Sequence, residues 1–263
     1  MSVFSKTYDS GNPAAVCILS QDDFDNTQLM QKIAKKINFS EVAFLSILNN
    51  QYLIRWFSPK KEVEICGHAT IAAFELLVKR GLVDLNKWVL IKSKKYNFRL
   101  RKDSISNTII LRLPIFELKE CTTNKINDVI DVSSVPRVSS SNLDYICEIN
   151  SLKNLRTVKV DFEKLIEVKK RGLIVSFLDS KSTDIYFRYF CPKLGFKEDP
   201  GTGSALSSLY TFWKKRVDFS KKVSFFQESR RKSRGFVQKL EKEDFLSLEA
   251  FVSDSFEKTL EID

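Results

Sequence analysis

The chain has 263 residues, a formal net charge of +10 and hydrophobic side chains at 43% of its positions, a composition typical of a folded globular protein and too apolar for a disordered one. No apolar run approaches the roughly 18 to 20 residues that a membrane-spanning helix needs, and the first residues lack the apolar stretch of a signal peptide, so we expect a cytoplasmic protein without membrane association. The five cysteines are odd in number and widely spaced, which indicates reduced thiols and excludes a disulfide framework or a zinc-binding cysteine cluster.

The first half of the chain alternates helical and strand patterns. Apolar residues at helical spacing predict a helix over residues 25–36. Two apolar runs, 42–45 and 52–57, predict paired strands around a turn at Asn49-Asn50, and a further strand is expected over 108–113. Serine pairs and triplets at 133–134 and 139–141 predict loops early in the second half.

An internal repeat is the most informative feature of the sequence. Arg55-Trp56-Phe57-Ser58-Pro59-Lys60 precedes Gly67-His68-Ala69, and Arg188-Tyr189-Phe190-Cys191-Pro192-Lys193 precedes Gly203-Ser204-Ala205. Each copy predicts a strand, a turn and a glycine at the start of a helix, over 69–77 in the first copy and 205–213 in the second. Both helices are small and apolar nearly all round, which is typical of a helix buried inside a sheet.

The repeat predicts an α+β protein of two related domains, 1–116 and 117–263, joined between Pro114 and Asp128. A helix that starts at a glycine presents backbone N–H groups and the positive end of its dipole to an anion. If the two domains face each other, both helix starts point into one cleft, which we expect to be the active site.

Three of the candidate reactive side chains lie at or near these helix starts, and the fourth, Glu41, follows an earlier predicted helix. The only histidine, His68, occupies the first of them, and Ser204 occupies the matching place in the second copy. Ser204 could cap its helix or donate a hydrogen bond to a substrate. Asp199 precedes the second helix in a turn sequence, where it is either a turn residue or a carboxylate that serves the cleft. Glu41 opens an apolar strand, and burial there would raise its pKa toward neutrality, as a general acid or base requires.

Several other reaction classes lack their sequence signatures. No nucleotide-binding glycine motif, phosphate-binding loop, histidine-rich metal cluster or nucleophile elbow is present. The positive charge leaves nucleic acid binding as an alternative, and its densest basic run is 230–234. The other basic residues are scattered and the stretch 241–263 is acidic, which favours a solvated basic surface suited to anionic substrates.

In combination, these motifs resemble those of the PhzF-like family of phenazine biosynthesis, whose fold is similar to that of diaminopimelate epimerase. The pieces that carry the resemblance span most of the chain in the order of the family: Gly11-Asn12-Pro13-Ala14-Ala15-Val16, Asn38-Phe39-Ser40-Glu41, Ile54-Arg55-Trp56-Phe57-Ser58-Pro59, Cys66-Gly67-His68-Ala69-Thr70 and Glu198-Asp199-Pro200-Gly201-Thr202-Gly203-Ser204-Ala205.

The resemblance implies two pseudo-symmetric domains, each a strongly bent, mostly antiparallel sheet wrapped round a central helix, and a homodimer. It implies an isomerase that uses no metal or organic cofactor and moves a proton between carbons of a small anionic or zwitterionic substrate, as in the isomerisation of dihydro-hydroxyanthranilate. Glu41 would shuttle the proton, with His68, Asp199 and Ser204 holding the substrate and assisting. The backbone at the two helix starts would bind the substrate, at Gly67, Ala69, Gly201, Thr202 and Gly203.

Two alternatives stay open at this point. An epimerase or racemase of the same fold would need two cysteines; Cys66 could supply one thiol, but we match it in the second half to Pro200, which cannot act as an acid or base. A non-catalytic protein that binds a small ligand or a nucleic acid is the other alternative. The joint presence of Glu41, His68, Asp199 and Ser204 favours an enzyme.

Overall fold

The computed structural model describes residues 1–122, 124–131, 135–240, 244–255, 257 and 259. The chain forms two compact units: unit 1 is Met1–Arg112 together with the segment from Glu249 onward, and unit 2 is Leu113–Leu248. The sequence predicts a second half that runs to residue 263, whereas the C-terminal segment belongs to unit 1. There it pairs with the N-terminal segment, since the Phe4 N–H donates to the Phe251 carbonyl at 2.8 Å.

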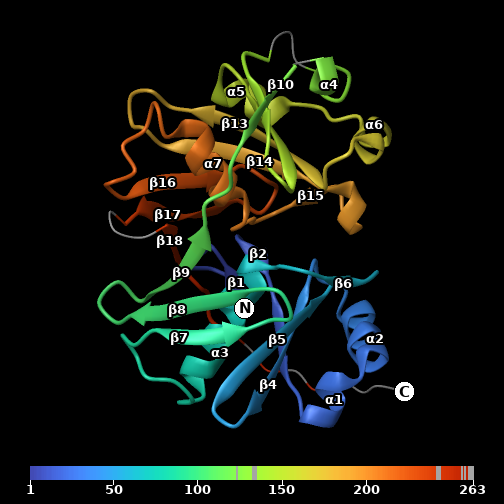
Figure 1. Cartoon of the computed structure of the whole chain (residues 1–263), viewed down its shortest axis with the longest axis vertical. Helices are drawn as coiled ribbons and strands as arrows, with labels where there is room; N and C mark the ends of the chain where they lie inside the picture. The colour runs from blue at the N-terminus through green and yellow to red at the C-terminus, as the bar shows by residue number, and fades with distance from the viewer. Residues whose placement is uncertain (123, 132–134, 241–243, 256, 258, 260–263) are drawn as a thin grey trace. The chain divides into compact units, whose positions relative to one another are not determined.

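Among its described residues, unit 1 has a mixed sheet, a small two-stranded sheet formed by its first two strands, and three helices, one of them central. Figure 1 shows these elements along the chain. Its helices are α1 (Gln21–Asp25), α2 (Thr27–Ile37) and α3 (Gly67–Lys79). Its strands are β1 (Ser2–Val3), β2 (Asn12–Pro13), β3 (Ala15–Ile18), β4 (Val42–Leu48), β5 (Gln51–Phe57), β6 (Glu62–Val63), β7 (Val89–Lys92), β8 (Asn97–Asp103) and β9 (Thr108–Pro114), the last of which ends two residues beyond the unit.

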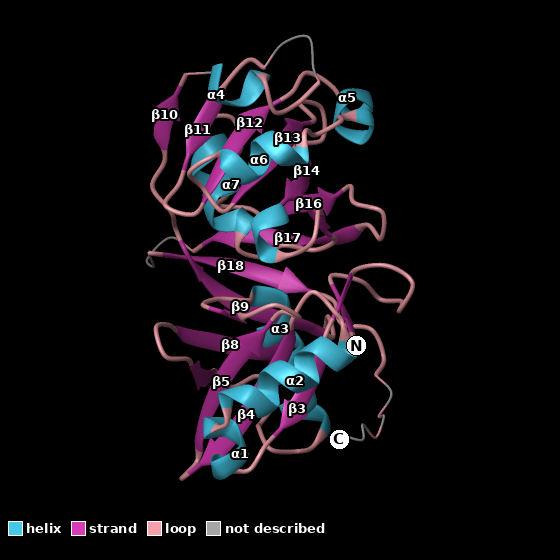
Figure 2. Cartoon of the chain, turned by 90° about the vertical axis from the view of Figure 1, so that its right-hand side faces the viewer, coloured by secondary structure: helices cyan, strands magenta, loops and turns pink. Residues whose placement is uncertain are grey.

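The two kinds of helix in unit 1 follow from their sequences. α2 is amphipathic, and its buried face (Met30, Ile33 and Ala34) packs against Phe44 and Phe57 of the sheet (Figure 2). α3 carries small and apolar residues on nearly every side, and it is buried against β3, β4 and β8. The sheet of unit 1 is therefore covered by two kinds of helix. α2 packs on it through one apolar face, and α3 is apolar on nearly every side.

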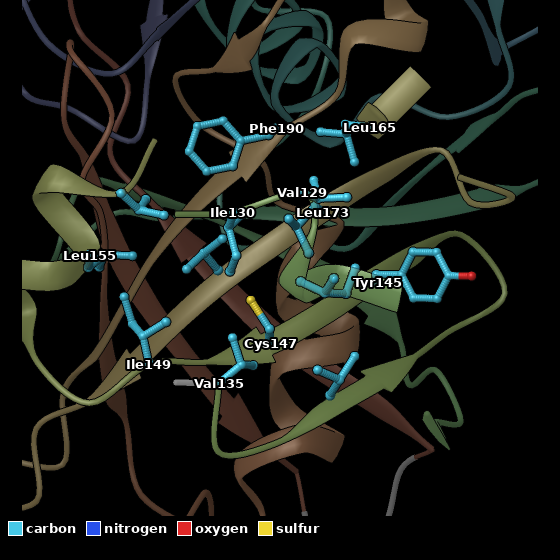
Figure 3. Close-up of a cluster of buried hydrophobic side chains, with 14 residues drawn as sticks. Val129, Ile130, Val135, Tyr145, Cys147, Ile149, Leu155, Leu165, Leu173 and Phe190 are labelled. Atoms are coloured by element: carbon cyan, nitrogen blue, oxygen red, sulfur yellow. The ribbon is translucent and has the colours of Figure 1, made fainter. Parts of the chain in front are cut away.

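Unit 2 repeats this arrangement of sheet and helices. Its helices are α4 (Asn124–Asn127), α5 (Leu152–Thr157), α6 (Phe162–Glu167), the 3-10 helix η1 (Pro192–Leu194) and α7 (Ala205–Trp213). Its strands are β10 (Lys119–Cys121), β11 (Val138–Ser140), β12 (Asp144–Glu148), β13 (Gly172–Leu178), β14 (Ile185–Phe190), β15 (Glu198–Asp199), β16 (Val223–Gln227), β17 (Ser233–Lys239) and β18 (Phe245–Ala250), whose last two residues belong to unit 1. One apolar cluster joins α5 and α6 to the sheet through Leu155, Leu165, Leu173 and Phe190 (Figure 3).

The strand pairings confirm the internal repeat. In unit 1, β3 pairs parallel with β4, β4 antiparallel with β5, β5 antiparallel with β6 and parallel with β7, and β7 antiparallel with β8. In unit 2 the same sequence of directions relates β12, β13, β14, β15, β16 and β17. The buried helices α3 and α7 follow β6 and β15 at corresponding places. The predicted α+β class and the two related, mostly antiparallel halves are confirmed.

One ion pair recurs in both units and shows how closely they correspond. Arg55 of β5 donates from Nε and Nη2 to both carboxylate oxygens of Glu62 at 2.8 and 2.9 Å. Arg188 of β14 makes the same two contacts to Glu198, both at 2.8 Å. The repeated arginine therefore ties the short strand before each central helix to the longer strand beside it.

Most predicted elements of the first half lie where the sequence placed them. The helix predicted over 25–36 is α2, and the paired strands are β4 and β5, joined at Asn49 and Asn50 with φ values of 48° and 60°. The central helices span Gly67–Lys79 and Ala205–Trp213, and the strand predicted over 108–113 is β9.

The serine-rich segments of the second half gave a poorer prediction. The loop predicted over 139–141 is wrong for its first two residues, because Ser139 and Ser140 belong to β11 and pair with Ile146 and Tyr145 of β12. The loop predicted at 133–134 lies outside the described residues. Across the described parts of the chain, no helix combines the length and the apolar character needed to cross a membrane.

Candidate functional site

Glu41 lies in a buried position directly before the central sheet of unit 1. Helix α2 ends at Ile37, the left-handed backbone of the capping residue Asn38 (φ 56°) turns the chain, and β4 begins at Val42. The carboxyl group of Glu41 is thereby carried into the interior, with 6% of the residue exposed. The predicted burial of this carboxyl group is thus present in the structure.

His68 lies beside Glu41. It is the second residue of α3, it is 3% exposed, and its Nε2 atom is 3.6 Å from Oε2 of Glu41. Extended backbone at Cys66 (φ −145°) delivers the chain to Gly67, so the first turn of α3 points the imidazole at the start of β4. The structure therefore brings together two of the four predicted reactive residues within unit 1.

Asn12 sets the protonation pattern of this imidazole. Its side-chain Nδ2 lies 3.1 Å from Nδ1 of His68, and its Oδ1 accepts a hydrogen bond from Ser40 Oγ at 3.3 Å. An amide nitrogen only donates, so Nδ1 must accept and carries no proton. The neutral ring then carries its proton on Nε2, which faces Glu41 and lies 3.5 Å from Ser40 Oγ.

The imidazole is neutral in this environment. Burial lowers the pKa of His68 from 6.5 to about 3. An imidazolium would also place an N–H group on Nδ1 against the donor amide of Asn12. The 3.6 Å approach to Glu41 is therefore between a neutral imidazole and a carboxyl group, and it is longer than a hydrogen bond.

Glu41, Cys66 and His68 each have a potential ligand atom within 4.8 Å of the others, so these buried side chains could hold a metal ion, and the expected absence of a metal stays a prediction. The Cys66 sulfur lies 3.4 Å from Nδ1 of the imidazole, whereas the Glu41 carboxylate lies on the Nε2 side. The carboxyl group of Glu41 and the imidazole of His68 are also groups that can transfer a proton.

In unit 2, Asp199 and Thr202 form part of a buried loop that leads to α7. The Thr202 hydroxyl donates to the Asp199 carboxylate, and the Thr202 N–H donates to Gln227 Oε1 at 2.6 Å. The amide of Gln227 returns a hydrogen bond to the Asp199 carbonyl, also at 2.6 Å. Gln227, which the sequence did not single out, thus holds the loop at both ends.

Ser204 lies at the start of α7 and makes a different contact from the helix cap considered above. Its side chain does not cap the helix, and its Oγ accepts a hydrogen bond from Nη2 of Arg171 at 3.4 Å. Arg171 also contacts the buried carboxylate of Asp144, to which Tyr189 donates at 2.8 Å. The role of Ser204 as a helix cap is therefore not seen, and its hydrogen bond to a substrate stays a prediction.

The five residues predicted to bind the substrate through their backbone are all buried at the two helix starts. Gly67 and Ala69 belong to the first turn of α3. Gly201, Thr202 and Gly203 lead into α7, and the backbone N–H of Thr202 is engaged by Gln227. These positions agree with the predicted helix starts, while their role toward a substrate stays a prediction.

The repeat identifies the residue of unit 2 that corresponds to Glu41. Val42 pairs with Phe57 in unit 1, and Leu173 pairs with Phe190 in unit 2. Because Phe57 and Phe190 match in the repeat, Glu41 corresponds to Gly172. An added Cβ at Gly172 would lie 2.6 Å from the Phe190 carbonyl oxygen, so no side chain fits there.

The repeat also gives a different corresponding residue for Cys66. Counted back from the matching glycines at 67 and 203, Cys66 corresponds to Thr202 and not to Pro200. The Thr202 hydroxyl is bonded to Asp199, and threonine supplies no thiol. A symmetrical pair of thiols is therefore absent from these matched positions.

Two repeated α+β units, each built round a buried helix that begins beside polar side chains, define the fold class of the epimerase-like proteins. The chain belongs to the PhzC-PhzF family of phenazine biosynthesis-like proteins, whose sequence pattern it matches over residues 1–245. This confirms the family resemblance identified in the sequence.

Individual relatives agree in sequence and in fold. An uncharacterized isomerase of Halalkalibacterium halodurans is 33% identical over 239 residues, which cover 88% of this chain and 86% of that protein. The crystal structure of a PhzC/PhzF protein from Clostridium difficile is 27% identical, has a TM-score of 0.83 and shares 99% of this chain and 97% of its own. A predicted epimerase from Pseudomonas aeruginosa shares the fold, with a TM-score of 0.73 at 18% identity over 94% of this chain and 93% of its own.

Proposed function

We propose that this protein is an isomerase that moves a proton between carbons of a small carboxylate-bearing substrate without a cofactor, with Glu41 as the general acid and base. The observation that carries the proposal is the buried Glu41 carboxyl group, 3.6 Å from a neutral imidazole whose Nε2 proton faces it. Membership of the phenazine biosynthesis-like family supports it, as does a relative named as an isomerase.

In the proposed reaction, Glu41 as a carboxylate takes a proton from an acidified carbon and returns it to a second carbon of the conjugated system. The Nε2 proton of His68 stabilises the carboxylate in its ionised form, or donates to a substrate oxygen on which negative charge develops. Both roles need a proton on Nε2, which is where the neutral ring carries it when Asn12 donates to Nδ1. General acid–base catalysis of this kind contributes about a hundredfold to ten-thousandfold in rate.

Asp199 and Ser204 are proposed to serve the same reaction by holding the substrate, as the family resemblance implies. Their buried positions before and at the start of α7 are consistent with this role. A two-thiol epimerase has less support, because the position that corresponds to Cys66 is Thr202. The basic run of 230–234 falls on the turn between β16 and β17 and the start of β17, where Ser233 donates to the Pro200 carbonyl of the loop before α7 at 2.7 Å. The homodimer and the cytoplasmic location stay predictions from the sequence.

The test is exchange of substrate protons for deuterium, followed by NMR in deuterated water. The substrates are dihydro-hydroxyanthranilate and a panel of cyclic and linear amino acids. Glu41→Gln preserves the size of the side chain and removes its basicity, so we expect exchange to fall at least a hundredfold while binding changes little. The matched control is Glu62→Gln, which removes a partly exposed carboxylate that pairs with Arg55. Wild-type exchange in the Glu41→Gln variant would refute the assignment of Glu41.

A further inference from the structure

The strongest unassigned feature of unit 2 is the guanidinium group of Arg171. It lies directly before β13 and donates from Nε and Nη2 to the two carboxylate oxygens of Asp144, at 3.2 and 2.9 Å. Asp144 is 1% exposed and also accepts from Tyr189, and burial together with Asp144 raises the pKa of Tyr189 well above 10. Arg171 is consequently fixed in position by a buried anion whose other contact is an uncharged phenol.

The internal repeat shows that Arg171 occupies a position of functional interest. It corresponds to Ser40 in unit 1. Val42 of β4 and Leu173 of β13 are matched positions, and Ser40 and Arg171 each lie two residues before them. Ser40 Oγ lies 3.5 Å from Nε2 of His68, and Arg171 Nη2 lies 3.4 Å from Ser204 Oγ. In both units, therefore, this residue reaches the side chain at the start of the buried helix.

The chemistry of the two places nevertheless differs. Unit 1 has the carboxyl group of Glu41 there, whereas unit 2 has Gly172, at which a Cβ would meet Tyr189 and the Phe190 carbonyl. Unit 2 instead presents a permanent cation, because a guanidinium keeps its charge in proteins. This place is unsuited to removing a proton from carbon and suited to contact with an anion.

The hydrogen bond from Arg171 also fixes what Ser204 can do. A guanidinium only donates, so the Ser204 oxygen accepts from it, and the hydroxyl proton of Ser204 is left to point elsewhere. The α7 backbone reinforces a preference for negative charge, since the positive end of its dipole lies at Ser204. Ser204 is held as a hydrogen-bond donor between the N-terminal end of α7 and a guanidinium that is paired with Asp144.

We infer that Arg171 is a positioning residue that holds Ser204 as a donor to a negatively charged group of the substrate, and so makes the protein select carboxylates. The inference rests on the proposed function for the reaction that the carboxylate would undergo. It assigns selection of the anion to unit 2 and places no proton transfer there.

The test is a comparison of binding of anthranilate and its uncharged carboxamide, anthranilamide, by ligand-observed NMR titration. Wild-type protein is expected to bind anthranilate at least tenfold more tightly than the carboxamide, since a charged hydrogen bond is about twice as strong as a neutral one. Arg171→Met is expected to bring this ratio close to one, and Arg171→Lys to restore part of it. Arg188→Met is the matched control, because Arg188 binds Glu198 in the same two-point manner without touching Ser204.

Arg171→Met leaves the buried Asp144 without its cation and can prevent folding, so Asp144→Asn/Arg171→Met is measured with it. Asp144→Asn alone keeps the cation and is expected to keep the preference for anthranilate. The inference would be overturned if the folded double variant kept the wild-type ratio of affinities for anthranilate and anthranilamide. It would also be overturned if wild-type protein gave a ratio of one or bound neither compound. Glu41→Gln should retain the ratio, so loss of the proposed proton transfer and loss of carboxylate selection are separate results.

Discussion

The neutral state of His68 makes a quantitative prediction about stability and pH. The pKa of this imidazole is about 3 in the folded protein and 6.5 without the effect of burial. Between these values the unfolded chain binds more protons than the folded chain, so the free energy of unfolding falls as the pH falls from 6.5 toward 3. At about 1.36 kcal/mol for each pH unit, His68 costs the folded state about 2.5 kcal/mol on going from pH 7 to pH 4.5.

The perturbation is His68→Gln, in which an amide N–H replaces the Nε2 proton and no group titrates. We expect the free energy of unfolding, measured by urea titration at pH 7.0, 6.0, 5.0 and 4.5, to fall less steeply for the variant than for the wild type. The carboxylates of the protein titrate in both and largely cancel in the difference. That difference should grow to about 2.5 kcal/mol at pH 4.5.

Parallel pH profiles for the two proteins would refute this account, because they would mean that His68 is charged in the folded state and paired with Glu41. NMR of protein labelled with ¹⁵N-histidine gives an independent reading. The chain has one histidine, so a single imidazole reports both the pKa and the tautomer.

Three other substitutions test the contacts around the two helix starts. Asn12→Asp places a hydrogen-bond acceptor beside Nδ1 of His68, so we expect the proton of the neutral imidazole to move to Nδ1. We also expect the pKa of the imidazole to rise by about 1 to 3 units and the proton exchange catalysed by Glu41 to slow. An Nε2–H tautomer in the ¹⁵N spectrum would contradict this. Gly172→Ala should destabilise the protein by about 1 to 3 kcal/mol, because its Cβ would lie 2.6 Å from a backbone carbonyl oxygen, and an unchanged urea midpoint would show that the strand moves freely. Gln227→Leu removes the hydrogen bonds to a buried N–H and a buried carbonyl of the loop before α7. We expect the free energy of unfolding to fall by about 1 to 3 kcal/mol for each group left unpaired. Thermal unfolding that matches the wild type would count against the role of Gln227 in holding that loop.

The sequence predicted the parts of the fold whose information is local. The repeated aromatic strand, turn and glycine gave both central helices, because helix starts and turns are encoded by neighbouring residues. Pairings between distant residues left no such signal. The C-terminal segment joins unit 1 through contacts such as the Ser253 N–H to the Ser2 carbonyl at 2.9 Å, and nothing in the local sequence marks it.

The candidate site divides in the same way. Glu41 and His68 were found because each lies at a recognisable boundary of a predicted element. Asn12 appeared only as part of a family motif, because its function depends on a histidine 56 residues away. Arg171 was missed entirely, since a lone arginine in a basic chain carries no signal until its buried partner, Asp144, is known.

The repeat itself separates structural from functional residues. The ion pairs of Arg55 with Glu62 and Arg188 with Glu198 are alike in both units, as expected of contacts that hold similar strands together. The positions that precede the matched strands differ: a carboxyl group at Glu41 has no counterpart at Gly172, which lies beside a cation. The glycine has a structural reason, because a Cβ at Gly172 would lie 2.6 Å from the Phe190 carbonyl oxygen, whereas Glu41 has no such restriction and carries a reactive group. The proposed roles follow this difference: Glu41 of unit 1 is proposed to transfer the proton, and Arg171 of unit 2 is proposed to hold Ser204 as a donor to a carboxylate.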